Sequence, residues 1–271
     1  MTPHEFVSVQ QLSQGFSEYA LRPTGLWVGR SLGLYTAQGL NLHIHCLNTE
    51  SAWIEMDDVD GQHYRFSTDY KILNLTADLS FLDFLIPSHI LPQGRCISCS
   101  ALFNTQQATA FIIWGMLPLE SEYSLSTFYR ASQNLPISAV QVAFYHAGLN
   151  QAWRDSLITI QATDQLIGRK FQFRYSEQDL YQHHYLNEKF YTWQCLKGIE
   201  AGLCETDRCY YFALAEQVYL LVWIEKIIPT LGIVVEDLNN LRSHGKICGY
   251  AGYESGQISN FIVGAYAEEV S

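Results

Sequence analysis

Short runs of β-branched and aromatic residues, separated by turn residues, recur along almost the whole chain. Turn signals such as Asp60-Gly61, Pro92-Gln93-Gly94 and Ser243-His244-Gly245 lie between these runs. The runs are Ile72–Leu75, Phe81–Ile86, Ala108–Trp114, Gln141–Tyr145, Lys170–Tyr175, Val218–Trp223, Leu231–Val235 and Lys246–Tyr250. Many short strands at close spacing predict a sandwich or barrel rather than alternating strands and helices. A short helix is expected within residues 3–20, with Thr2 as its N-cap before Pro3.

The chain also contains an internal repeat with a period close to the size of one small domain. Gly29-Arg30-Ser31-Leu32 recurs as Gly168-Arg169-Lys170-Phe171, an offset of 139 residues. After a gap of one residue the offset becomes 140, and further matches follow in the same order. The matches are Tyr35 with Tyr175, Gln38 with Gln178, Leu40 with Leu180, His43 with His183, Trp53 with Trp193, and Phe81–Phe84 with Tyr219–Val222. A period this long is typical of a duplicated domain, because solenoid repeats are about 20–50 residues long.

The repeat predicts two similar β-domains in one chain. We expect an N-terminal extension over residues 1–20, a first barrel over 21–130, a linker and joining segment over 131–154, and a second barrel over 155–271. Ser121–Pro136, where Ser is frequent and no alternation is evident, is expected to begin the connection. The predicted fold class is all-β, with two tandem antiparallel β-barrels and a few short helices.

Composition supports a large core and narrows the choice of partners. The chain has 271 residues, of which 48% are hydrophobic and 16% charged, and its formal net charge is −11. The acidic balance argues against a nucleic-acid binder or a protein of anionic membrane surfaces, because both need basic patches. There is no apolar run of about 18 residues to predict a membrane-spanning helix, and the polar start does not resemble a targeting segment. We therefore expect a cytoplasmic protein. Its oligomeric state is left open, and a homodimer is one alternative to a monomer.

Two segments contain residue types that bind metals, but neither pattern is specific. His43 and His45 share one face of a predicted strand, while Cys46 points to the other. Cys96 and Cys99 form a single Cys-x-x-Cys pair, whereas a structural zinc site needs four ligands. The seven cysteines fit no small disulfide scaffold, and free thiols are the simplest interpretation. The expectation is therefore no metal, no cofactor and no disulfide.

One nucleophile motif is present, in Gly29-Arg-Ser-Leu-Gly33. It matches the Gly-x-Ser-x-Gly pattern of hydrolases, in which Ser31 would be the nucleophile. That motif needs a helix after it, whereas the residues after Gly33 resemble a strand, and the second copy of the repeat has Lys170 in place of Ser31. A turn into a strand is the preferred interpretation. The glycine-rich patterns of nucleotide-binding loops are absent from the sequence.

The most informative polar residue lies at the end of an apolar strand. Within Gln217–Lys226, Tyr219, Leu221, Trp223 and Glu225 alternate on one face, and the opposite face is also apolar. Such a strand is covered on both sides or lines a cavity, with Glu225 at the mouth or floor. A carboxyl group beside Trp and Tyr is desolvated, which raises its pKa and suits a general acid at neutral pH. The alternative is a strand-end Glu paired with a surface Lys.

Further aromatic residues alternate in the same half of the chain, in Phe171–Tyr175 and Tyr181–Tyr185. If these faces converge, they line a cavity suited to a small, flat, mostly apolar ligand. The alternative is that they simply fill a small barrel. The residues expected to line the cavity are Tyr175, Tyr181, His183, Trp193, Tyr219, Trp223 and Glu225. Asp207 and Arg208 are added as a charge pair whose alternative is a surface salt bridge, and the first-barrel counterparts are Leu40, Asn41 and Phe81.

Long motifs in the second half resemble a known family. They are Tyr191–Tyr211, Tyr219–Gly232, Gly245–Tyr250 and Ser259–Tyr266. Together they resemble the C-terminal domain of the molybdenum cofactor biosynthesis protein F (MoaF) family. Phe81–Phe84 and Ala108–Ile112 are similar to that family's N-terminal domain. The resemblance implies two lipocalin-like, or calycin, β-barrels in tandem.

The second half also resembles, more distantly, the phenolic acid decarboxylases, small calycin barrels that need no cofactor. Ile167–Tyr175 is similar to their first strand, Gly198–Gly202 to their glycine-framed turn, and Val222–Glu225 to the strand with their acidic catalytic residue. This resemblance implies that Glu225 is the catalytic acid and Tyr175 one of two functional tyrosines.

Two substitutions distinguish this chain from the decarboxylases. Phe173 replaces the second functional tyrosine, and Leu203 replaces the arginine that would bind a substrate carboxylate. Decarboxylation of a phenolic acid is therefore not expected, while acid–base chemistry by Glu225 and Tyr175 stays open. The sequence predicts a small apolar or aromatic ligand in the second barrel and a cofactor-free lyase, isomerase or cyclase of a biosynthetic pathway. The alternative is a lipocalin-type binding protein without catalysis.

Overall fold

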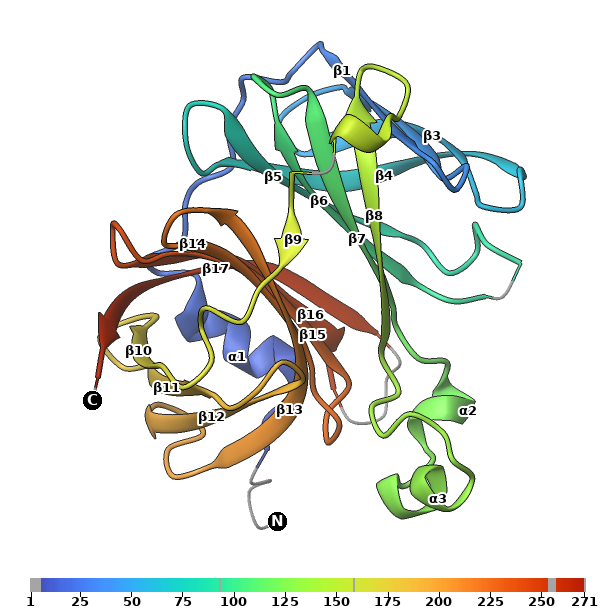
Figure 1. Cartoon of the computed structure of the whole chain (residues 1–271). Coiled ribbons are helices and arrows are strands. Elements are labelled where there is room, and N and C mark those ends of the chain that lie inside the picture. Colours follow the sequence, from blue (N-terminus) through green and yellow to red (C-terminus); the bar gives the residue numbers. More distant parts are fainter. Residues whose placement is uncertain (1–5, 93, 158, 253–256, 271) are drawn as a thin grey trace. The chain divides into compact units, whose positions relative to one another are not determined.

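The computed structural model describes residues 6–92, 94–157, 159–252 and 257–270, which form two compact units (Figure 1). One unit comprises residues 22–119 and 141–159, and it is called the N-terminal barrel here. The other comprises residues 1–21, 120–140 and 160–271, and it is called the C-terminal barrel. Each unit is built around its own closed antiparallel sheet.

The N-terminal barrel contains eight strands that pair in chain order. They are β1 (Ser31–Thr36), β2 (Asn41–Cys46), β3 (Ser51–Asp57), β4 (His63–Asn74), β5 (Leu79–Ile86), β6 (Ile97–Asn104), β7 (Thr109–Met116) and β8 (Gln141–Leu149). The sheet closes because β1 pairs with β8, with Leu34 opposite Leu149. A short 3₁₀ turn, η1 (Asp155–Leu157), follows β8.

The C-terminal barrel has the same strand order. It consists of β10 (Lys170–Arg174), β11 (Leu180–Tyr185), β12 (Phe190–Lys197), β13 (Cys204–Ala215), β14 (Val218–Ile224), β15 (Thr230–Asp237), β16 (Arg242–Tyr250) and β17 (Ile258–Glu269). β10 pairs with β17, and β12 pairs with β13, which closes the sheet. A two-residue strand, β9 (Gln161–Ala162), pairs with the far end of β13. The prediction of two tandem antiparallel barrels is therefore confirmed.

The internal repeat is also present in the structure, strand for strand. Gly29 and Gly168 both adopt positive φ angles, 74° and 84°, in the turn before the first strand of each barrel. Each of their N–H groups donates to the carbonyl oxygen at the end of the second strand, to Cys46 and Tyr185 respectively, at 2.8 Å. Ser31 opens β1, and a strand follows it rather than a helix, as expected for a turn into a strand.

The offset of the repeat is 139 residues through the first five strands, which corrects the predicted value of 140. The facing pairs Leu34–Leu42, Ile44–Ile54 and Tyr70–Phe84 correspond at this offset to Phe173–Tyr181, His183–Trp193 and Cys209–Trp223. The predicted match of Phe81 with Tyr219 has an offset of 138, which is one residue less than the observed 139. A slip of one residue in a strand exchanges inward and outward side chains. Tyr35, His43 and Trp53 accordingly point out of their barrel, while Tyr175, His183 and Trp193 point into theirs.

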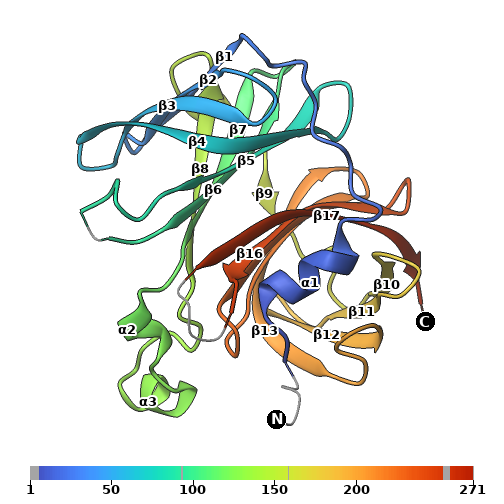
Figure 2. The ribbon, with the colours of Figure 1, turned by 180° about the vertical axis from the view of Figure 1, so that it is seen from behind.

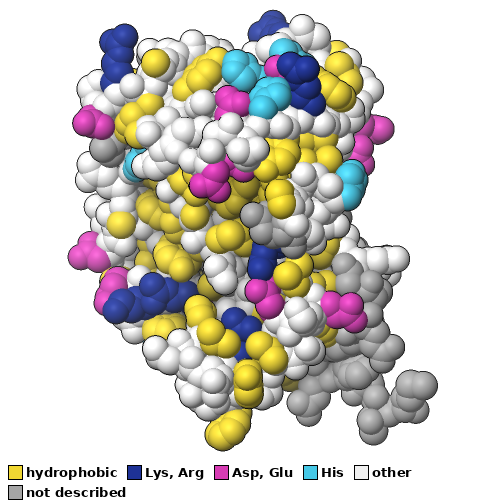
Figure 3. Space-filling view, turned by 90° about the vertical axis from the view of Figure 1, so that its right-hand side faces the viewer, with side chains coloured by type: hydrophobic (Ala, Val, Ile, Leu, Met, Phe, Trp, Pro, Cys, Tyr) yellow, Lys and Arg dark blue, Asp and Glu magenta, His cyan; other side chains and the backbone are white. Residues whose placement is uncertain are grey.

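The outward face of β2, β3 and β4 is polar. His43 lies opposite Glu55, and Glu55 forms an ion pair of 3.4 Å with Arg65. His45 Nδ1 lies 2.8 Å from the Ser31 hydroxyl oxygen, while Cys46 is buried on the opposite face, as the alternation predicts. Figure 3 shows histidine and charged side chains gathered on the surface of this barrel. Among the described residues, no group of three or more His, Cys, Asp or Glu is arranged to hold a metal ion.

Two segments that were predicted to lie outside the barrels belong to them in the structure. The predicted joining segment, 131–154, contains β8, because the N-terminal barrel needs an eighth strand to satisfy the edges of β1 and β7. The connection before β8 holds two short helices, α2 (Glu120–Tyr123) and α3 (Thr127–Ser132). The predicted N-terminal extension contains α1 (Val9–Phe16), which belongs to the C-terminal barrel. In the described part of the chain, no helix is long and apolar enough to span a membrane.

Helix α1 packs against β16 and β17 of the C-terminal barrel (Figure 2). Ser8 is its N-cap, and the Ser8 N–H donates to the Gln11 side chain at 3.0 Å, as in a capping box. Val9, Leu12 and Phe16 form one apolar stripe, and all three are buried in the core of this barrel. The helix therefore begins six residues later than the expected start at residue 3, and the proposed cap Thr2 lies outside the described residues.

One end of the C-terminal barrel interior contains a fully buried carboxyl group. The Tyr185 hydroxyl donates to Glu236 Oε1 at 2.6 Å, and Glu236 is 0% exposed. The second oxygen, Oε2, has no hydrogen-bond partner among the described residues. Burial raises the pKa of Glu236 to about 7, against the lowering effects of the Tyr185 hydrogen bond and the Arg169 charge.

The pKa of Glu236 predicts a dependence of folding stability on pH. The folded-state pKa of about 7 lies above the ordinary value of 4.5, so folding favours the protonated carboxyl. The protonated Glu236 carboxyl contributes fully to the free energy of unfolding below pH 4.5. This contribution, about 3 kcal/mol, is lost as the pH rises through 7. Glu236→Gln keeps an oxygen that accepts from Tyr185 and does not titrate. Urea unfolding at pH 5 and pH 8 should show a smaller loss of stability for this variant, and an equal loss would contradict the assignment.

Candidate active site

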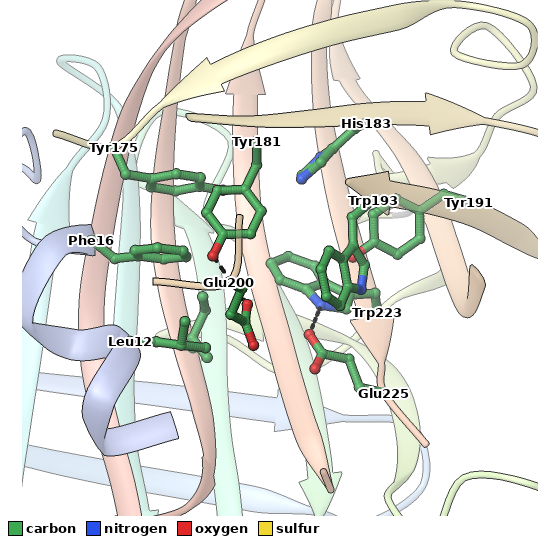
Figure 4. Close-up of a pocket in the computed structure, with 11 residues that line it drawn as sticks. Leu12, Phe16, Tyr175, Tyr181, His183, Tyr191, Trp193, Glu200, Trp223 and Glu225 are labelled. Carbon is green, nitrogen blue, oxygen red and sulfur yellow. Dashed lines mark hydrogen bonds between the residues drawn. The ribbon is translucent and has the colours of Figure 1, made fainter. Parts of the chain in front are cut away.

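A pocket lies inside the C-terminal barrel and is lined mainly by aromatic residues (Figure 4). Its lining comes from α1, from the inward faces of β11, β12, β14 and β16, from the residues directly after β10 and β14, and from one turn. The lining residues are Leu12, Phe16, Tyr175, Tyr181, His183, Tyr191, Trp193, Glu200, Trp223, Glu225 and Ile247. The free space among them is about 30 Å³, enough for about two water molecules.

Glu225 presents its carboxyl group to this pocket from the residue after β14. Its Oε1 accepts a hydrogen bond of 2.9 Å from the Trp223 indole N–H, two residues earlier on the same face. Its backbone is fixed on both sides, because its N–H donates to Thr230 and its carbonyl accepts from the Ser138 hydroxyl, each at 2.9 Å. Burial, and then the charge of Asp207, raise the pKa of Glu225 well above its ordinary value. Both effects favour the protonated form of the Glu225 carboxyl group.

Glu200 supplies a second carboxyl group to the pocket. It lies in the turn between β12 and β13 and is 6% exposed. Its Oε2 accepts from the Tyr181 hydroxyl at 3.0 Å, and its Oε1 accepts from the Val7 backbone N–H at 3.3 Å. Burial raises its pKa, and these two hydrogen bonds oppose the rise. The prediction missed Glu200, although the glycine-framed turn Gly198–Gly202 had been singled out.

On the inward face of β13, opposite Trp193 and Tyr191, two more carboxyl groups pair with one lysine. The Trp193 indole N–H donates to Asp207 Oδ2 at 3.0 Å, which fixes the indole ring in the wall. Lys226 Nζ lies 3.2 Å from Asp207 Oδ1 and 2.7 Å from Glu205 Oε1. Burial raises the pKa of Asp207, while Lys226 lowers it. Asp207 thus positions Trp193 and does not itself line the pocket.

His183 and Tyr175 complete the inner part of the pocket. His183 is 4% exposed, and burial lowers its pKa to about 3, so its imidazole is neutral. Its Nδ1 has no hydrogen-bond partner among the described residues. The Tyr175 ring stacks on the Phe16 ring of α1, with 4.3 Å between centroids and 7° between planes. Phe16 therefore covers one face of the Tyr175 ring.

The structure brings together most, but not all, of the predicted site residues. Those that line the pocket are Tyr175, Tyr181, His183, Trp193, Trp223 and Glu225. Tyr219 points into the same barrel but lies away from the pocket, where its hydroxyl donates to Gln165 at 3.0 Å. Arg208 lies on the other face of β13, with its guanidinium over the Phe190 and Tyr210 rings. Leu12 and Phe16 were missed because they come from the far end of the chain.

The N-terminal barrel has a different interior at the equivalent positions. At the offset of 139, Thr36, Leu42, Ile44, Ile54, Phe84 and Ile86 take the places of Tyr175, Tyr181, His183, Trp193, Trp223 and Glu225. All but Thr36 belong to the aliphatic and aromatic core of that barrel. Titratable groups at these positions are thus a property of the C-terminal barrel.

Comparison with known proteins identifies the family. The MoaF N-terminal domain matches residues 4–118, and the MoaF C-terminal domain matches residues 160–271. The chain is also 36% identical over 266 residues to Protein MoaF of Klebsiella aerogenes, covering 97% of this chain and 94% of that protein. The chain belongs to the MoaF family. The MoaF C-terminal domain contains β9 to β17, with every pocket residue except Leu12 and Phe16, while β8 lies between the two matched ranges.

A solved structure matches one part of this MoaF family member. The crystal structure of a candidate beta-lactamase from Burkholderia vietnamiensis aligns with 41% of this chain and 99% of that chain. The sequence identity is 12% and the TM-score is 0.33. At this level of similarity no argument about function follows.

The position of the Trp223 indole depends on a glycine in the facing strand, which predicts the effect of Gly232→Ala. Trp223 lies opposite Gly232, and a Cβ atom at Gly232 would overlap the indole ring. We expect the ring to be displaced, its hydrogen bond to Glu225 to break, and unfolding stability to fall by about 1–3 kcal/mol. Tryptophan fluorescence and urea unfolding measure both effects. In Gly25→Ala, where the Cβ would make an ordinary 3.6 Å contact, neither should change; unchanged fluorescence in Gly232→Ala would contradict the assignment.

Proposed function

We propose that the C-terminal barrel binds a small apolar or aromatic metabolite and acts on it by cofactor-free acid–base chemistry. Glu225 is the proton donor, and Tyr175 holds the polar end of the substrate. The reaction class is that of a lyase, isomerase or cyclase. The observation that carries this proposal is a carboxyl group with a raised pKa that faces an aromatic pocket and is held by Trp223 at 2.9 Å.

The raised pKa gives Glu225 the property that general acid catalysis needs. A carboxylic acid with an ordinary pKa is ionised at neutral pH and has no proton to give. Burial and the neighbouring Asp207 favour the protonated form of Glu225. The two backbone hydrogen bonds to Thr230 and Ser138 keep this group in one place relative to the pocket. A carboxyl group that is held in place and favours its protonated form supports acid–base catalysis.

Substrate entry requires a change at α1. The free space of about 30 Å³ is smaller than an aromatic ring, because Leu12 and Phe16 fill one side of the pocket. A ligand can enter when Phe16 leaves its position on Tyr175. The stacked Phe16–Tyr175 pair also indicates that the site accepts a flat ring.

A lipocalin-type carrier is the second candidate, favoured by the aromatic lining of a closed barrel. A carrier of an apolar ligand gains no affinity from a desolvated carboxyl group, because burial of that group is unfavourable. The two candidates therefore differ in the role of Glu225, which the following variants test.

Glu225→Gln should abolish turnover and preserve binding. The amide oxygen still accepts from Trp223, but the side chain has no transferable proton, so kcat should fall about 10²–10⁴-fold. Metabolite extract incubated with each protein and analysed by mass spectrometry identifies compounds that the wild type consumes. Glu188→Gln, at an exposed turn on the same barrel, is the matched control and should consume them normally. Turnover by Glu225→Gln at the wild-type rate would refute the catalytic role, and binding without turnover in every protein would favour the carrier.

Tyr175→Phe should instead weaken binding of those compounds. The change removes one hydroxyl and keeps the ring that stacks on Phe16. Loss of one hydrogen bond to the ligand should cost about 0.5–1.5 kcal/mol of binding free energy. Quenching of tryptophan fluorescence measures this, because Trp193 and Trp223 line the pocket. An unchanged affinity would show that Tyr175 contributes only its ring.

A further inference from the structure

The charges around the pocket are strongly one-sided. Its lining includes two carboxyl groups, Glu200 and Glu225, and none of the described lining residues is Lys or Arg. Glu205 and Asp207, on the inward face of β13, both pair with Lys226, which also donates to the Thr206 carbonyl. One lysine is therefore shared between these two carboxyl groups, while Glu200 and Glu225 face the pocket with no Lys or Arg among the described lining residues.

The walls beside these carboxyl groups are aromatic rings that suit a cation. Tyr181 contacts both Phe16 and Glu200. Its ring centroid lies 5.1 Å from that of Phe16, and its hydroxyl donates to Glu200 at 3.0 Å. The Trp193 ring lies 6.1 Å from the Tyr181 ring. Electron-rich faces of Tyr and Trp stabilise an ammonium group, and most strongly where water is excluded. Figure 4 shows the Glu200 and Glu225 carboxyl groups on the same side of these rings.

An independent observation indicates that the pocket receives a polar atom. The His183 side chain is 4% exposed and lines the pocket, and its Nδ1 has no hydrogen-bond partner within the described chain. Figure 4 shows its ring turned towards the other lining residues. A buried nitrogen without a partner is unfavourable unless a ligand or water supplies the hydrogen bond.

We propose that the ligand of this pocket is an aromatic compound with a protonated amine, whose ring replaces Phe16 on Tyr175 and whose ammonium group pairs with Glu200. This inference rests on the proposed function, because it names the substrate class of the same site. Glu200 is the counter-charge, since it already accepts hydrogen bonds from Val7 and Tyr181 that favour its ionised form. Glu225 keeps its separate role as the proton donor. A ligand carboxylate would meet acidic groups and no Lys or Arg among the described lining residues.

The position of α1 is compatible with displacement by such a ring. The helix approaches the barrel closely through Gly15, where a Cβ atom would overlap the Asp179 carboxyl group. On this side of the helix lies an open groove, lined among others by Gln11, Lys197 and Ile199. There is therefore open space beside the helix that carries Phe16, although Phe16 itself does not line this groove.

Three probes that share one ring and differ in charge test the proposal: benzylamine, benzyl alcohol and benzoate. Affinities for the full chain are measured by tryptophan fluorescence quenching and by saturation-transfer NMR. Benzylamine should bind about 10-fold or more tightly than either of the others, because only its ammonium pairs with Glu200. Phe16→Ala should strengthen binding of benzylamine and of benzyl alcohol alike, because the ring position is then open.

Glu200→Gln should remove the preference for benzylamine over benzyl alcohol and leave the affinity for benzyl alcohol unchanged. Glu188→Gln changes the net charge equally but lies on an exposed turn, so the preference should persist. Equal binding of the three probes, or an intact preference in Glu200→Gln, would overturn the amine assignment and leave the proposed function standing. Absence of binding by every probe to Phe16→Ala would overturn both, while loss of turnover in Glu225→Gln tests the catalytic role separately.

Discussion

When an antiparallel sheet of eight strands closes on itself, every second side chain of each strand is committed to one shared interior. In the C-terminal barrel this closure is completed by β10 with β17 and by β12 with β13. It brings His183, Trp193 and Trp223, which are far apart in the chain, into one pocket. The facing strand must then provide room, which Gly232 does for the Trp223 indole. The position of Glu225 follows, because its carboxyl group is held by that indole.

The two barrels share one pattern of backbone hydrogen bonds but have very different inward side chains. Facing pairs in the first five strands correspond at an offset of 139 residues, so Ile44–Ile54 in one barrel corresponds to His183–Trp193 in the other. The strands pair in the same way with different inward side chains, as long as these side chains fill the interior of the barrel. The aliphatic choice gives a core, whereas the aromatic and titratable choice gives a pocket. At these positions the N-terminal barrel thus has core residues, and the C-terminal barrel has titratable groups.

Buried carboxyl groups are unfavourable in this interior, and the structure offsets the cost in several ways. Trp193 and Trp223 donate to Asp207 and Glu225, Tyr181 donates to Glu200, and Lys226 pairs with Asp207 and Glu205. The remaining cost is visible as raised pKa values of Glu200 and Glu225. Helix α1 adds to the burial, since Leu12 and Phe16 fill one side of the same space. A fold without function would gain stability by replacing these groups with apolar ones, which supports the proposed role.

Alternation along the chain determined the all-β class and the shared face of Trp223 and Glu225, because alternation along a strand is a local property. Residues that match at a fixed offset indicated the duplication. The long motifs of the second half resemble the MoaF family, and the comparisons confirm this family. The register between the two copies was missed by one residue, since similar residues such as His43 and His183 occur on opposite faces. Only tertiary structure assigned β8 to the first barrel and brought α1 and Glu200 to the pocket. These contacts join segments that are distant in sequence. The closure of each sheet into a barrel decides which segments meet, and a local sequence pattern does not contain this information.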